Sequence, residues 1–198
     1  MREKTTLAAA GTLGTGPVQI AAATGIQTGG GSINVTVAGT TQSLTINEPV
    51  LSNSGTVAGG AIRLQATGDI SSPAANNGTI TSSGSDTDLA GGEILIYSTG
   101  GDITLDENVS ASGNGTAAGG LVTIKTDKAA GAVSVGNVTS SSGTGTAGII
   151  QIQSGTGGIS QLAGSALTGL SLKVVSTGTV NLPEANAVSN FAADLSTA

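Results

Sequence analysis

The sequence contains no cysteine, histidine or tryptophan among its 198 residues. The absence of cysteine excludes disulfide bonds, thiol catalysis and thiolate metal sites. Aromatic residues make up 1% of the chain, as Tyr97 and Phe191, so a core that relies on buried aromatic area is excluded as well. The interior must instead be built from valine, isoleucine, leucine and alanine, which suits many thin layers better than one large core.

Charge is also scarce, with six basic and twelve acidic residues and a net charge of −6. No cluster of lysine and arginine exists, so the electrostatic signature of nucleic-acid binding is missing. No uninterrupted apolar run reaches the length of about 18 residues that a membrane-spanning helix needs. We therefore predict neither nucleic-acid binding nor membrane insertion.

The N-terminal residues 1–16 lack a clear pattern. Their apolar stretch is short and is interrupted by Gly11 and Gly14, unlike the apolar region of a secretory signal. We predict an irregular segment here.

The chain does contain a repeated sequence motif. A pair of small residues, often Gly-Gly, is followed by an alternating run of β-branched residues. The motif occurs five times, and its leading apolar residues are Ile33, Ile62, Ile94, Val122 and Ile150. The steps between them are all close to about 30 residues, and a period in this range predicts stacked supersecondary units rather than one globular core.

Each repeat divides into three segments of strand length. The first follows the small-residue pair, and the other two alternate apolar and polar residues, the period-2 pattern of a strand with one buried face. The second segment is clearest at residues 43–46, 102–105 and 132–135, and the third at residues 77–82, 108–112 and 137–141. Glycine-containing turns separate the first two segments, and the third leads into loops of glycine, serine and threonine.

These patterns predict an all-β fold, a parallel β-solenoid with three short strands per coil and about six coils of about 28–32 residues. Residues 17–198 are predicted to form one array. The abundant β-branched residues argue against a disordered chain. A β-sandwich would not explain why the same motif recurs along the sequence. No capping element is recognisable at either end, which predicts an excerpt from a longer array.

Residues 91–105 (GGEILIYSTGGDITL), 176–182 (STGTVNL) and 186–193 (NAVSNFAA) resemble the repeats of filamentous haemagglutinin-like exoproteins. These are large bacterial surface or secreted β-strand-repeat proteins, many of them exported by two-partner secretion. The resemblance covers residues 17–198. It implies a right-handed parallel β-helix, an extracellular or cell-surface location, and a role in adhesion or surface structure. The secretion domain expected at a family member's N-terminus is not recognisable.

Some parallel β-helices cleave polysaccharides, which requires paired carboxylates or an acidic cluster with a basic partner. The candidates for that chemistry are Asp102, Asp106, Glu107 and Asp127, with Lys125 or Lys128. We interpret these side chains as solvated corners and loops, and predict no catalytic residues.

Calcium requires several oxygen ligands at close spacing. Asp86 and Asp88 share one loop, and Asp106 and Glu107 share another, but the calcium-binding Gly-Gly-x-Gly-x-Asp repeat is absent. We predict no metal site and no cofactor.

Two polar series are predicted to be structural. Asparagines precede the third strand in successive coils, where they form either an amide ladder or turns: Asn77, Asn108 and Asn137. Four threonines are predicted to point outward without aligning into a column: Thr36, Thr45, Thr104 and Thr123.

The sequence therefore predicts a non-enzymatic structural or adhesive segment of a large exported bacterial protein. Its partners would be glycans or a neighbouring cell surface, bound through shallow, multivalent contacts on the loop side or on a flat strand face. Two alternatives stay open. One is a fragment of a carbohydrate-active β-helix enzyme, which would have a carboxylate-lined groove; the other is a filament subunit that associates end to end.

Overall fold

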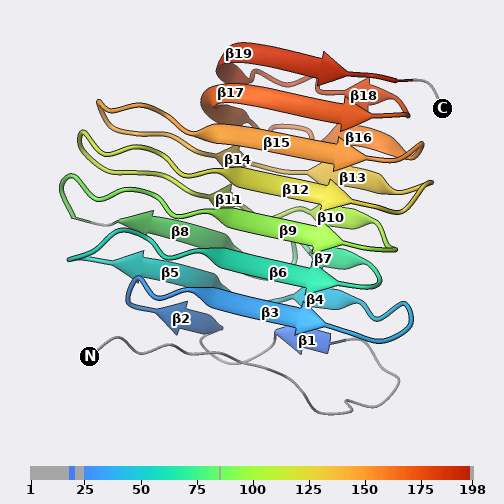
Figure 1. The fold of residues 1–198 in the computed structure, drawn as a ribbon, viewed down its shortest axis with the longest axis horizontal. Coiled ribbons are helices and arrows are strands. Elements are labelled where there is room, and N and C mark those ends of the chain that lie inside the picture. Colours follow the sequence, from blue (N-terminus) through green and yellow to red (C-terminus); the bar gives the residue numbers. More distant parts are fainter. Residues whose placement is uncertain (1–17, 21–24, 85, 197–198) are drawn as a thin grey trace.

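The computed structural model describes residues 18–20, 25–84 and 86–196, and these form a parallel β-solenoid (Figure 1). Every strand pair is parallel, as in β3 with β6 and β10 with β13, and no helix occurs in the described residues. The predicted fold is confirmed. The irregular segment expected at residues 1–16 lies outside the described residues.

The strands form three faces, which we number in the order the chain passes through them. Face 1 contains β3 (Ile33–Val37), β6 (Ile62–Ala66), β9 (Ile94–Ser98), β12 (Val122–Thr126), β15 (Ile149–Ser154) and most of β17 (Leu167–Ser176). Face 2 contains β1 (Val18–Ile20), β4 (Leu44–Ile46), β7 (Ile70–Ser72), β10 (Ile103–Leu105), β13 (Ala132–Val135), β16 (Gly158–Gln161) and β18 (Val180–Asn181). Face 3 contains β2 (Ile26–Thr28), β5 (Val50–Ser54), β8 (Ile80–Gly84), β11 (Val109–Ser110), β14 (Val138–Thr139) and the start of β17. The last strand, β19 (Ala187–Asp194), pairs with β17.

The coil is right-handed. In Figure 1 the strands of face 1 run to the right in front, and the chain returns behind them through faces 2 and 3 while it rises from the N-terminal to the C-terminal end. Within the described residues, five complete three-strand coils begin at β3, β6, β9, β12 and β15, with incomplete coils before and after them.

Coil length changes near the C-terminal end. The strand register places Ile150 beside Leu172 and Leu172 beside Phe191, so the last two steps along the chain are shorter than every earlier step and shorter than predicted. The difference comes from β17, which runs without a break across the corner between faces 3 and 1. Its first residues pair with β14 and its last six with β15, whereas earlier coils cross this corner through a loop.

The core consists of aliphatic columns that run along the axis. Alternate residues of each strand point inward, and each lies beside its equivalent in the next coil, as Ile62, Ile94, Val122 and Ile150 do on face 1. These four side chains are buried. Because successive parallel strands are about 4.8 Å apart, each layer is thin enough for small aliphatic side chains to fill it.

Buried hydroxyls occupy the corners. The Ser98 hydroxyl donates to the Gly68 carbonyl at 2.7 Å and accepts from the Gly101 N–H at 2.7 Å. In the next coil the Thr126 hydroxyl donates to the Gly101 carbonyl at 2.6 Å. No buried side-chain polar atom in the described part of the chain lacks a partner, so the chain turns each corner without leaving these polar groups unsatisfied.

Candidate binding face

Face 1 presents two columns of outward side chains, because each of its strands turns alternate residues outward. The first column is Asn34, Arg63, Leu95, Thr123, Gln151 and Lys173. The second column is Thr36, Gln65, Tyr97, Lys125, Gln153 and Val175. Amide, hydroxyl and basic groups therefore recur along one flat surface at the spacing of the coils.

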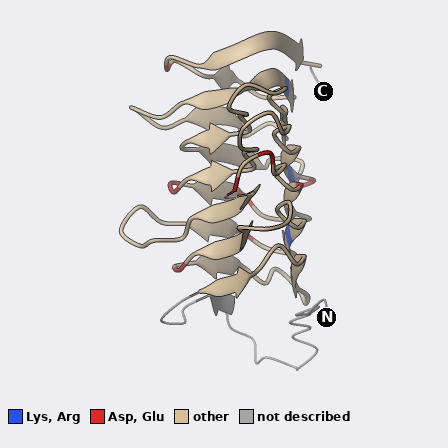
Figure 2. Ribbon diagram, turned by 90° about the vertical axis from the view of Figure 1, so that its left-hand side faces the viewer, with Lys and Arg blue, Asp and Glu red and all other residues tan. Residues whose placement is uncertain are grey.

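The basic residues gather on this side of the rod. Of the lysines and arginines that the structure describes, Arg63, Lys125 and Lys173 lie on face 1, and Lys128 follows the end of β12. Among the residues that the structure describes, Figure 2 shows Lys and Arg on one side of the solenoid only, whereas Asp and Glu also occur on the opposite side. Face 1 therefore carries more basic than acidic side chains, although the chain as a whole has a net charge of −6.

Tyr97, Lys125 and Asp127 form a cluster at the edge of face 1 in which the side chains contact one another. The Tyr97 hydroxyl donates a hydrogen bond to the Asp127 carboxylate. The Lys125 ammonium lies 4.0 Å from the Tyr97 ring centroid and 3.9 Å from Asp127 Oδ1. That hydrogen bond, together with burial and the charge of Asp127, raises the pKa of Tyr97. Tyr97 therefore remains a protonated donor at neutral pH, and Lys125 is held over β9.

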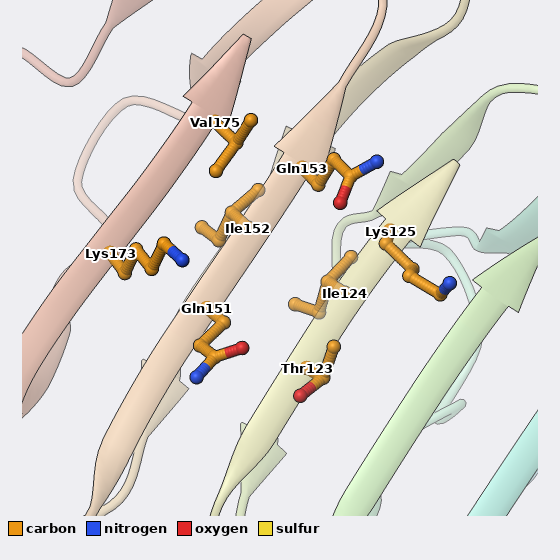
Figure 3. Close-up of a pocket in the computed structure, with 8 residues that line it drawn as sticks. All are labelled: Thr123, Ile124, Lys125, Gln151, Ile152, Gln153, Lys173 and Val175. Atoms are coloured by element: carbon orange, nitrogen blue, oxygen red, sulfur yellow. The ribbon is translucent and has the colours of Figure 1, made fainter. Parts of the chain in front are cut away.

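A shallow hollow of about 100 Å³ lies on the other side of Lys125, on strands β12, β15 and β17. In Figure 3 Lys173 extends from β17 toward β15, where Gln151 and Gln153 project from the strand. Lys173 is exposed, and none of the described residues forms an ion pair with it. An enclosed ligand pocket typically has a volume of roughly 300 Å³ or more. The hollow therefore fits a single polar group of a ligand that stays largely outside.

The acidic residues considered for catalysis are divided between two corners of the coil, and the lysines lie near two of them, Lys128 beside Asp102 and Lys125 beside Asp127. Asp102 and Asp127 lie near the corner between faces 1 and 2, whereas Asp106 and Glu107 follow β10 at the next corner. At that next corner, Asp106 accepts a hydrogen bond from the Ala74 N–H at 3.4 Å.

Asp102 is a structural link between coils. The Lys128 ammonium lies 3.0 Å from its Oδ1, which also accepts a hydrogen bond from the Ala132 N–H at 3.0 Å. Burial raises the pKa of Asp102, but these two hydrogen bonds and the charge of Lys128 outweigh it and hold the pKa below its usual value. A glycosidase acid needs the opposite shift.

The residues considered for calcium binding also connect loops. Asp88 Oδ1 accepts hydrogen bonds from the Thr116 N–H at 2.7 Å and the Thr116 hydroxyl at 2.6 Å, which joins the loops of adjacent coils. These bonds lower the pKa of Asp88. Asp86 lies in the same loop, but no three acidic, histidine or cysteine side chains converge as metal ligands within the described ranges.

The asparagine series forms a partial ladder. The Asn137 amide donates to Asn108 Oδ1 at 2.9 Å, and Asn137 Oδ1 accepts from the Ala166 N–H at 2.8 Å. At the earlier coils the amide pair is formed by Asn76 and Asn47, at 2.7 Å. The neighbour of Asn77 therefore makes the amide contact there, which the spacing of the asparagines did not predict.

The threonine prediction is wrong for one pair. Thr45 and Thr104 both pair with Ser71 on face 2, so they share one outward column of hydroxyls. They align because both lie at the centre of a second strand. Thr36 and Thr123 lie on face 1, in different columns.

The fold and this surface define a class, a parallel β-solenoid with one flat, amide-rich and basic face. Comparisons with known proteins add no family, since no family model, curated protein or solved structure matches the chain. Over the described residues, no helix has the length and apolarity to cross a membrane.

Proposed function

We propose that this chain is a non-enzymatic, adhesive and structural repeat segment of a large secreted or cell-surface bacterial protein of the filamentous haemagglutinin-like type. The observation that carries the proposal is face 1, where two columns of outward side chains, polar except for Leu95 and Val175, continue across successive coils. Such a surface suits an extended partner that makes many equivalent contacts.

The chemistry of face 1 favours a glycan. Glutamine, asparagine, threonine and tyrosine offer both donors and acceptors, which match the hydroxyl groups of sugars. Each contact is shallow, so affinity would come from many contacts made at once. The partner would lie on a host or neighbouring cell, with the rod outside its own cell and no cofactor involved.

The non-enzymatic part of the proposal is supported by the state of the acidic residues. Asp88 and Asp102 both have lowered pKa values, and both hold backbone N–H groups of a neighbouring segment. Carboxylates in that state hold coils and loops together, whereas the general acid of a glycoside hydrolase stays protonated until it transfers its proton.

The test is glycan binding by the whole chain, displayed first as a single copy and then as a tetramer on a scaffold. We expect weak binding by single copies and a gain of about 10²-fold or more on tetramerisation. The Gln151→Ala, Gln153→Ala double variant of face 1 should weaken binding, whereas the matched Ser134→Ala, Ser160→Ala variant of face 2 should not.

Two results would contradict this function. Equal losses of glycan binding in the two double variants would show that face 1 is not the binding surface. A fall in glycan chain length during incubation with the protein would favour a carbohydrate-active enzyme.

A further inference from the structure

We propose that face 1 binds a linear acidic polysaccharide whose carboxylates are sparse, laid along the solenoid axis, with Lys173, Gln151 and Gln153 holding one carboxylate. This inference rests on the proposed glycan-binding function and specifies its ligand class.

The spacing of the cations is the first argument. Arg63 lies on β6, Lys125 on β12 and Lys173 on β17, and one strand of face 1 separates each from the next. Consecutive cations are therefore two coils apart, about 10 Å along the axis for a strand spacing of about 4.8 Å. Duplex DNA, by comparison, carries one charge per about 1.7 Å. Face 1 matches a polymer with few charges, since a dense polyanion would leave most of its charges unpaired.

Neutral hydrogen-bonding side chains beside and between the cations are the second argument. Gln65 and Thr123 lie on the strands of Arg63 and Lys125, in the same two columns, and Tyr97 lies on the strand between them. They suit the uncharged, hydroxyl-bearing portions of a polymer between its carboxylates. Neither column contains an acidic residue from β3 to β17, and β19 extends the second column with Asp194, which pairs with Val175.

The free ammonium of Lys173 is the third argument. Arg63 donates to Gln65 Oε1 at 2.7 Å, and Lys125 lies near Asp127 and Tyr97, so both charges are partly satisfied within the protein. Lys173 is exposed and makes no ion pair with the described residues. It borders the hollow with Gln151 and Gln153, where an ammonium and two amide NH₂ groups could donate to one carboxylate.

The experiment measures binding of the whole chain to three probes at low ionic strength. The probes are hyaluronan, which has one carboxylate per disaccharide and no sulfate, its carboxyl-reduced neutral form, and heparin, which is densely sulfated. We expect hyaluronan to bind about tenfold or more tightly than the neutral form, because a charge-assisted hydrogen bond contributes at least the free energy of one decade in affinity. Added salt should weaken hyaluronan binding.

A matched pair of variants tests the position of the site. Lys173→Gln should weaken hyaluronan binding by about fivefold to tenfold. Lys128→Gln removes the same charge from a lysine bonded to Asp102 beyond the strand, and should change binding by less than about twofold. Circular dichroism spectra identical to that of the parent would show that both variants are folded.

The outcomes separate this inference from the function on which it rests. Equal binding of hyaluronan and its neutral form would overturn the acidic ligand and leave glycan binding in place. Equal losses in the two lysine variants would overturn the Lys173 site, and tighter binding of heparin than of hyaluronan would overturn the match to sparse charge. Failure to bind these probes and neutral glycans alike would contradict both proposals.

Discussion

At the scale of single residues, the buried hydroxyls at the corners determine how the chain can turn. Ser98 is the third inward residue of β9, beside Ala66 and Thr126 in the adjacent coils. Its inward direction follows from the alternation in the sequence, but its role does not. Serine is more often exposed than buried, and only the folded corner places the Gly68 carbonyl and the Gly101 N–H within reach of one hydroxyl.

Ser98→Ala should destabilise the solenoid by about 1–3 kcal/mol, because it leaves buried backbone groups without a hydrogen-bond partner. Steric strain should be absent, since alanine already occupies the same column at Ala66. The measurement is the free energy of unfolding from denaturant titration. The control is Ser134→Ala, an outward serine on face 2, which should change stability by less than about 0.5 kcal/mol. Equal changes in the free energy of unfolding in the two variants would show that the Ser98 hydroxyl does not stabilise the corner.

Asp102 should make stability depend on acid pH. Its pKa in the folded state is below the usual 3.8, so the folded state binds fewer protons than the unfolded state in that range. The stabilisation is therefore fully present above the unfolded pKa and is lost as the pH falls through the folded pKa. Melting temperatures measured from about pH 5 to about pH 2 should fall less steeply in Asp102→Asn than in the parent.

The control for this prediction is Asp86→Asn, in an exposed loop and without an ion pair to the described residues. It should keep the parent's slope. A parental slope in Asp102→Asn as well would show that the link between Asp102 and Lys128 contributes nothing to acid stability.

At the scale of elements, the sequence was sufficient where its pattern was regular. The second strands expected at residues 43–46, 102–105 and 132–135 are observed as β4, β10 and β13, with ends that differ by at most one residue. Their alternation of apolar and polar residues reports directly which face is buried.

β17 could not be predicted in the same way. The repeat pattern predicts a loop after the third segment of each coil, but here the structure has one strand of ten residues. Gly169 allows the continuous path, because a Cβ there would lie 3.1 Å from the Gly148 carbonyl oxygen. The Leu170 N–H bonds to that same carbonyl at 2.8 Å. A contact with the preceding coil therefore takes the place of the loop. The local alternation of apolar and polar residues cannot predict such a contact.

Glycine pairs precede β6, β9 and β12, and their glycines stack in a column that requires close backbone contact. A Cβ on Gly92 would clash with the Ser82 hydroxyl and would lie 2.5 Å from the Gly59 carbonyl oxygen. Gly92→Ala should therefore force adjacent coils apart and destabilise the protein by about 1–3 kcal/mol. Gly29→Ala is the control, because no atom lies within 4 Å of its added Cβ. Thermal melts should separate the two variants, and a parental melt for Gly92→Ala would show that the column tolerates a side chain.

At the scale of the whole molecule, the candidate site arises only from stacking. Arg63, Lys125 and Lys173 are far apart in the sequence, and loops of unequal length separate them. Their common face follows from the strand register, which the sequence leaves undetermined once the coils shorten beyond Ile150. The sequence therefore left the loop side and a flat strand face as candidate binding surfaces, without identifying which residues form either.

Stacking also predicts that a whole coil is dispensable. Removal of residues 94–121 joins Glu93 to Val122, which occupies the same column position as Ile94, so β12 would stack on β6 with inward and outward residues unchanged. Stability in such arrays is a sum of coil and interface terms. The deletion should therefore fold and unfold cooperatively at a lower melting temperature, with a rod shorter by about 4.8 Å in small-angle scattering.

Removal of residues 94–107 is the control. It joins Glu93 to Asn108, so the loop that leaves face 3 after β8 leads directly into β11, which also belongs to face 3. This variant should fail to fold. If the full-coil deletion were also unfolded, stability would depend on contacts beyond neighbouring coils, and the description of the molecule as interchangeable layers would be wrong.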